Sequence, residues 1–243
     1  SEGRMKTFRG YPRSEERMKT FRGYPRSDGN VGIRNNVLVL SLVQCANSTA
    51  NKIAQRCQVP GITIDTGCGE FKEQERRTNL GLIRAGQHPN TFGVLLVSLG
   101  CQWTDPEYIA KEISKTGTKV AHLCIQEEGG VEATVEKGIQ IVNSLREEGK
   151  LMSRVDCPIT KLVLSVYCGG SDWSSSLAAN AVTGETVDMF GDDGGTFISS
   201  SIRGMAGNEQ HLIELAKDYE VGNQILDIIS EYRRDIFELT GQS

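Results

Sequence analysis

The stretch LVLSVYCGGSDWSSSLAAN, residues 162–180, sets the plan that decides the fold. A short apolar run predicts a buried strand, a cysteine and small residues end it, and the next residues begin a helix. The same plan recurs in VLVLSLVQCANSTA, ITIDTGCG and VLLVSLGCQWTDPEYI, at residues 37–50, 62–69 and 94–109. The ends of the four predicted strands are therefore each followed by a cysteine: Cys45, Cys68, Cys101 and Cys168.

The position of these four thiols favours a shared site. The carboxyl ends of parallel strands meet at one edge of a sheet, where ligands bind in open α/β folds. Thiolates bind iron, zinc and iron–sulfur clusters, so the four cysteines are predicted metal ligands. The alternative is that they are small buried hydrophobic residues, since free cysteine is among the most buried residue types. The close CxxC spacing that marks a metal site is missing, so both interpretations stay open.

Composition excludes several classes of protein. The chain has 243 residues and a net charge of −4, which argues against a general nucleic-acid binder. It has no apolar run of transmembrane length and no signal-peptide pattern, so no membrane partner is expected. Seven cysteines in or near apolar strands indicate a reducing, cytoplasmic location and not a disulfide framework.

The chain begins with a repeat, because RMKTFRGYPRS occurs at residues 4–14 and again at residues 17–27. We interpret residues 1–17 as a cloning remnant, with a duplicated arm as the alternative. Residues 18–155 are predicted to form one α/β domain, and residues 156–243 to begin a second.

Strands and helices alternate through the first domain. Strands are expected at residues 37–43, 62–65, 94–99 and 119–125, and helices at 47–58, 71–85, 106–116 and 131–148. Asn47 or Ser48 is the expected N-cap of the first helix. This alternation predicts a doubly wound, mostly parallel sheet with helices on both faces.

A linker is expected next, at residues 150–158, and then a second, incomplete α/β unit. Its expected strands lie within residues 160–166 and 191–201, and its expected helices at 178–190, 209–216 and 221–239. Two strands are few for an independent sheet.

Several polar residues have two interpretations from the residues alone. The segment 24–36 is either a solvated turn or an anion-binding arm, because guanidinium groups recognise carboxylates. Ser171 and Asp172 either cap a helix or bind substrate hydroxyls at its first turn. Arg77 on a polar helix is either solvated or a carboxylate ligand. None of the three histidines, His88, His122 and His211, has metal-ligand spacing.

Seven motifs together resemble the altronate and galactarate dehydratase family, which includes the large subunit of sulfolactate sulfo-lyase. They run in order through the chain: YPRSDGNVGIRN (24–35), VQCANSTA (43–50), TGCGE (66–70), HPN with VLLVSLGC (88–101), QEEGG (126–130), YCGGSD (167–172) and GGTFISS (194–200). The resemblance covers about residues 19–242.

The resemblance implies an iron-dependent lyase that removes water from a sugar acid such as altronate or galactarate and gives a 2-keto-3-deoxy acid. The alternative within the family is elimination of sulfite from sulfolactate. A hydroxy acid substrate, a homo-oligomer and a separate small SAF-domain subunit are the expected partners. The iron is expected as a ferrous ion or an iron–sulfur cluster on the four strand-end cysteines.

The family motifs also suggest residues for the reaction. Ser171 and Asp172 are the catalytic candidates. The candidates for substrate binding are Asp28, Arg34, Asn35, Asn47, Arg77, Gly169, Gly170 and Asn180.

The sequence departs from the family in four places. Asp65 and Thr66 stand where the family has histidine, Ser201 replaces a glutamate, and Ala181 replaces a proline. The family also continues for more than a hundred residues past the end of this sequence, so a C-terminal truncation is expected. A non-catalytic fragment or scaffold that needs a partner is therefore a further alternative. A nucleotide-binding domain is not favoured, because no GxGxxG or GxxxxGK[ST] follows a strand.

Overall fold

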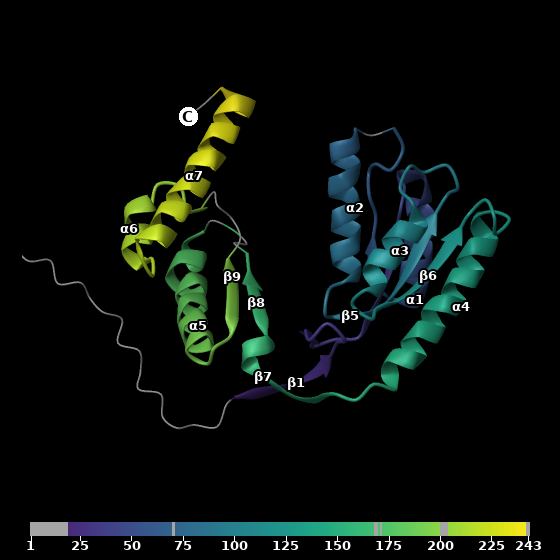
Figure 1. Ribbon diagram of the computed structural model, residues 1–243, viewed down its shortest axis with the longest axis horizontal. Coiled ribbons are helices and arrows are strands. Elements are labelled where there is room, and N and C mark those ends of the chain that lie inside the picture. The colour runs from purple at the N-terminus through teal and green to yellow at the C-terminus, as the bar shows by residue number, and fades with distance from the viewer. Residues whose placement is uncertain (1–18, 70, 168–169, 171, 200–203, 242–243) are drawn as a thin grey trace, which may run out of the picture. The chain divides into compact units, whose positions relative to one another are not determined.

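The computed structural model describes residues 19–69, 71–167, 170, 172–199 and 204–241 (Figure 1). These residues divide into two units at Lys161 and Leu162. Of the predicted site residues, Cys168, Gly169 and Ser171 lie outside the described part.

The first unit is built on a four-stranded parallel sheet in the order β4-β3-β5-β6. The strands are Gly61–Ile62, Asn36–Ser41, Thr91–Ser98 and Lys119–Cys124. Every residue of the central strand β5 is buried, as expected for a strand covered on both faces. In the register, Leu96 of β5 lies opposite Leu40 on one side and His122 on the other.

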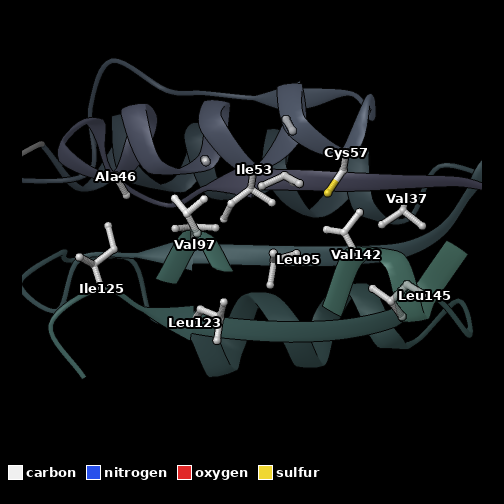
Figure 2. Packing of buried hydrophobic residues seen from close by; sticks show 14 of the residues in the cluster. Val37, Ala46, Ile53, Cys57, Leu95, Val97, Leu123, Ile125, Val142 and Leu145 are labelled. Carbon is white, nitrogen blue, oxygen red and sulfur yellow. The ribbon is translucent and has the colours of Figure 1, made fainter. Parts of the chain in front are cut away.

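Helices cover both faces of this sheet, so the predicted doubly wound α/β fold is confirmed. On one face lie α1 (Asn47–Cys57) and α4 (Val131–Lys150), which enclose a core that includes Val39, Ile53 and Leu95 (Figure 2). On the other face lie α2 (Lys72–Gly86) and α3 (Pro106–Ser114). Alternation along the strands sends successive apolar side chains into the two cores.

A small antiparallel sheet, in the order β2-β1-β7, also belongs to the first unit. Its strands are Val31–Gly32, Thr20–Pro25 and Val155–Pro158. The last strand corrects the predicted linker at residues 150–158, because its residues pair with β1 from Thr20↔Pro158 to Gly23↔Val155. Cys157 is buried in this pairing.

The second unit holds two parallel strands, β8 (Val163–Val166) and β9 (Thr196–Ser199). A π-helical turn at Ser175–Ala179 leads into α5 (Asn180–Asp192), and α6 (Glu209–Leu215) and α7 (Tyr219–Thr240) follow. Among the described residues of this unit, Ile229 is the one hydrophobic residue that is buried. None of the helices described in either unit is long and apolar enough to cross a membrane.

Candidate functional site

Three strand-end cysteines of the first unit are exposed, whereas its other three cysteines are buried. Cys45 follows β3, Cys68 follows β4 and Cys101 follows β5, all at the carboxyl edge of the parallel sheet. The alternative interpretation of these three as buried core residues is therefore wrong. It holds instead for the cysteines inside elements, which are Cys57, Cys124 and Cys157.

Backbone hydrogen bonds tie the three loops that carry these thiols. The Gln44 N–H donates to the Thr66 carbonyl at 2.8 Å, and the Trp103 N–H donates to the Gly67 carbonyl at 3.1 Å. Gly67 has a φ of +104°, and a Cβ at this position would lie 2.7 Å from the Leu42 carbonyl oxygen. Only glycine fits this close approach without strain, so Gly67 keeps the Cys68 loop against the end of β3.

The structure does not test the predicted four-thiol metal site. Within the described ranges, no three His, Cys, Asp or Glu side chains lie close enough together to hold a metal ion. The exposed thiols are soft donors of the type that iron prefers, but the three do not by themselves form a site. Because Cys168 lies outside the described residues, an iron site on all four remains a prediction.

A serine–histidine pair lies in the half of the sheet that ends at the carboxyl edge, as the three exposed thiols do. Ser98 ends β5, His122 lies on β6, and Ser98 Oγ is 2.7 Å from His122 Nε2. Burial of the ring lowers the pKa of His122, while the charges of Glu127, Glu107 and Glu128 act in the opposite direction. A neutral imidazole is able to accept a proton, so His122 is a candidate base.

The sequence interpretation placed His122 within a strand, which is confirmed, but it missed the hydrogen bond to Ser98. The partner is 24 residues away in the chain and is brought close only by the pairing of β5 with β6. No local pattern marks such a pair.

The arm at residues 24–36 lies at the opposite edge of the sheet. The Asn90 side-chain carbonyl accepts from the Ile33 N–H at 2.7 Å, and the Asn36 N–H donates to the Asn90 backbone carbonyl at 2.8 Å. These bonds fix the arm where β3 and β5 begin. Strand β5 has eight residues, or about 26 Å at the usual rise per residue. Within this unit, the arm and the strand-end thiols therefore do not share one site.

The polar candidates in the arm make local bonds. The Asp28 carboxylate accepts from the backbone and side-chain N–H groups of Asn30, at 3.0 and 2.8 Å. Asn35 accepts from Arg26 Nη2 at 2.8 Å and donates to the Gly149 carbonyl at 3.0 Å. Asn35 therefore links the arm to the end of α4, and its predicted role in substrate binding is not tested.

Asn47 is not the N-cap that the sequence suggests, and neither is Ser48. The N-cap position of α1 is Ala46, which has no capping side chain. The Asn47 side chain is engaged instead with the backbone of Ile64, donating to its carbonyl at 2.8 Å and accepting from its N–H at 3.4 Å. These two bonds fix the loop after β4, and they occupy the Asn47 side chain so that it does not cap α1.

Arg77 lies near the start of α2, just after the Cys68 loop, and its side chain is 76% exposed. Its Nε donates to Glu73 at 3.1 Å, and Arg76 makes a two-pronged bond to the same carboxylate. Hydrogen bonds first from Arg76 and then from Arg77 lower the pKa of Glu73 to about 2. The side chain of Arg77 is thus solvated and paired on its own helix.

The candidates of the second unit are exposed in the described residues, which include Gly170, Asp172 and Asn180. The Asp172 carboxylate accepts from Ser174 Oγ at 2.5 Å and from the Ser175 N–H at 3.0 Å. These two bonds lower its pKa, with the Ser174 hydroxyl as the larger cause. Asp172 therefore caps the helix, as one of its two interpretations predicts. A catalytic role remains a prediction.

Comparison with known proteins gives matches to both units. The family model for D-galactarate dehydratase/altronate hydrolase, second domain, matches residues 23–150. The model for D-galactarate/altronate dehydratase, C-terminal, matches residues 159–242.

Individual relatives agree with this result. Altronate dehydratase from Bacillus subtilis (strain 168) is 28% identical over 240 residues, which cover 94% of this chain and 45% of the relative. Altronate dehydratase from Escherichia coli (strain K12) is 25% identical over 220 residues, or 85% of this chain and 44% of the relative. The beta subunit of (2R)-sulfolactate sulfo-lyase from Chromohalobacter salexigens is 29% identical over 212 residues, or 86% of this chain and 49% of the relative. The chain spans about half the length of these curated relatives.

Proposed function

The chain belongs to the D-galactarate dehydratase/altronate hydrolase family, and we propose that it acts in a lyase that removes water from a sugar acid. The observation that carries this proposal is the match of two successive family domains, together with relatives named altronate dehydratase and galactarate dehydratase. The proposed substrate is a hydroxy acid such as altronate or galactarate, and the proposed product is a 2-keto-3-deoxy acid.

Elimination of a β-hydroxyl next to a carboxylate sets three requirements. A base must take the proton beside the carboxylate, positive charge must stabilise the anion that forms, and an acid must assist the departure of hydroxide. His122 suits the first role, because its lowered pKa keeps the imidazole neutral near pH 7. Arg77 is the proposed cation for the second role, because it follows the Cys68 loop and is exposed, and it would leave its bond to Glu73 to bind substrate.

Bound iron would supply the Lewis acidity for the third requirement. We place it at the exposed thiols of the carboxyl edge of the first unit, Cys45, Cys68 and Cys101. The role of Cys168 stays a prediction from the sequence pattern alone. The support is the contrast between these exposed thiols and the buried cysteines inside elements. Whether the site takes a ferrous ion or a cluster is decided by acid-labile sulfide, which only the cluster releases.

Elimination of sulfite is the second candidate reaction. It is favoured by the 29% identity to the sulfo-lyase beta subunit, which this chain matches over 49% of its length. The name of that relative indicates an enzyme of more than one kind of subunit, so a separate small subunit is part of this candidate.

Turnover tests the proposal directly. The chain would be purified without oxygen, loaded with ferrous iron, and given galactarate, altronate and sulfolactate in parallel. We expect a 2-keto-3-deoxy acid from one of the sugar acids and no sulfite. Release of sulfite from sulfolactate would instead support the second candidate.

The matched control compares two cysteines of the same unit. Cys101→Ser should remove turnover, because it changes an exposed strand-end thiol, whereas Cys57→Ser changes a buried thiol inside α1 and should keep it. Equal activity in both variants would contradict the proposed site, and no product from any acid would contradict the proposed reaction.

A further inference from the structure

Two arginine side chains meet at a single backbone carbonyl at the amino edge of the sheet. The Ile33 carbonyl oxygen accepts from Arg34 Nη1 at 3.0 Å and from Arg154 Nη2 at 3.0 Å. Because both nitrogens bond to the same oxygen, they lie within about 6 Å of each other. The two residues are 120 positions apart in sequence and are joined here by the antiparallel sheet, since Arg154 directly precedes β7.

The Arg154 guanidinium is held in place by the surrounding structure, and the backbone that carries Arg34 is fixed. Arg154 lies over the ring of Tyr24 at 5.1 Å and is partly buried. The backbone of Arg34 is fixed from two sides, because its N–H donates to Asn90 Oδ1 at 3.2 Å and its carbonyl accepts from Arg26 Nη2 at 2.9 Å. Because such groups are already ordered, less side-chain conformational entropy is lost when a ligand binds.

Within the part of the chain that the structure describes, neither arginine of this pair forms an ion pair. Asp156, two residues after Arg154 in the chain, pairs with Arg22 instead. A carbonyl dipole satisfies hydrogen-bond donors but does not neutralise two full charges.

We propose that Arg34 and Arg154 form a clamp for one carboxylate of a small hydroxy acid. Each guanidinium keeps further N–H donors beyond the one given to Ile33, and the planar fork of donors matches a carboxylate. The class of ligand rests on the proposed function, whereas the clamp rests on the geometry of the two arginines.

This clamp is distinct from the thiol edge. It lies where the strands begin, and the length of β5, about 26 Å, separates it from their carboxyl ends. One small acid does not span that distance, so the clamp is a second carboxylate site of the unit. Arg154 is its new member, since no sequence motif marks the residue.

Tartronate is the probe, because it is a small hydroxy diacid without a β-hydroxyl and so is not dehydrated. Calorimetry on the whole chain measures its affinity, and the Nε–H signals of the arginines report the site by NMR. We expect the signals of Arg34 and Arg154 to shift on titration. Arg34→Gln and Arg154→Gln should each weaken binding by about tenfold, as the loss of one charge-assisted bond predicts.

Three comparisons complete the test. Arg84→Gln is the matched control, because Arg84 is an exposed arginine of α2 that bonds to Gln87, and it should bind tartronate as the unchanged chain does. Arg154→Lys keeps the positive charge but loses the planar fork of donors, so it should also bind tartronate more weakly. This variant tests the clamp in case Arg154→Gln folds poorly. Inorganic phosphate in place of tartronate should bind less tightly.

Binding that is unchanged in Arg34→Gln and Arg154→Lys would overturn the clamp, as would the absence of tartronate binding in the unchanged chain. Equal affinity for phosphate would overturn the assignment to carboxylate. Since tartronate is not turned over, these results are independent of whether the chain dehydrates sugar acids, and failure of the proposed function would be seen only in the turnover assay.

Discussion

Replacement of Gly67 by alanine tests how the Cys68 loop is held. The new Cβ would lie 2.7 Å from the Leu42 carbonyl oxygen and 2.7 Å from the Val43 Cα, both backbone atoms that cannot turn aside. The φ of +104° is also strained for alanine, which costs about 1–3 kcal/mol. Overpacking against the backbone of Leu42 and Val43, just after β3, adds about 1–3 kcal/mol, so we expect a loss of several kcal/mol in the free energy of unfolding.

Gly69→Ala is the matched control in the same loop. Gly69 also has a positive φ, at +79°, but a Cβ there would meet nothing within 4 Å. It should therefore cost only the backbone term, about 1–2 kcal/mol. The difference between the two variants isolates the close approach of the loop to β3.

Urea unfolding followed by circular dichroism measures both variants, and the reaction of Cys68 with a thiol reagent measures the loop itself. We expect Gly67→Ala to be the less stable variant and to alter the reactivity of Cys68 in the folded protein. Equal stabilities of the two variants would refute the argument that Gly67 brings the loop against the end of β3.

Other predictions concern the core and two ionisable groups. Ile53→Ala should lower the free energy of unfolding by about 2–5 kcal/mol, because Ile53 is fully buried between α1 and the sheet, whereas Leu80→Ala on the exposed side of α2 should change it by about 0.5 kcal/mol or less; similar losses in urea unfolding would contradict the packing. The folded-state pKa of Glu73 is about 2, below its ordinary value of 4.5, so its stabilising contribution is present above pH 4.5 and is lost as the pH falls towards 2; carboxyl NMR should show this titration, and an ordinary value would contradict the Arg76 and Arg77 bonds. The pKa of His122 lies below its ordinary value of 6.5 because desolvation disfavours the charged ring. Acid pH therefore destabilises the folded protein at this residue, and stability should rise as the pH increases towards 6.5. An imidazole NMR titration at or above 6.5 would refute this.

Elements with strong local periodicity could be predicted from the sequence. The four strands of the parallel sheet and the helices between them were expected near their observed places, because buried strands are apolar runs and amphipathic helices repeat every three to four residues. The shortest strand was the least accurate: residues 62–65 were expected, but the structure pairs only Gly61–Ile62 with β3. A two-residue pairing leaves almost no periodic signal.

Pairing between distant segments could not be predicted. Strand β7 pairs with β1 across more than 130 residues, as in Phe21↔Cys157, and neither strand is long enough to stand out by alternation. Residues 150–158 follow Gly149 and end in a proline without a clear alternation, so the sequence predicts a linker there. The meeting of Arg34 with Arg154 depends on this pairing and was therefore invisible too.

The candidate site was predicted in part. The sequence places Cys45, Cys68 and Cys101 at strand ends, and the structure confirms that these thiols are exposed at one edge. The sequence does not reveal that the arm at residues 24–36 lies at the opposite edge of the sheet, because sequence order does not tell which end of the strands a preceding segment packs against. The capping role of Asp172 follows from residue type and position alone.

The iron content of thiol variants tests the central claim most directly. The claim is that the exposed strand-end thiols, and not the buried ones, hold the metal of a sugar acid lyase. Iron and acid-labile sulfide would be measured on oxygen-free preparations of the unchanged chain, of Cys68→Ser and of Cys57→Ser. We predict that iron is bound by the unchanged chain and by Cys57→Ser and is lost from Cys68→Ser; equal iron in all three preparations, or none in any, would contradict the claim.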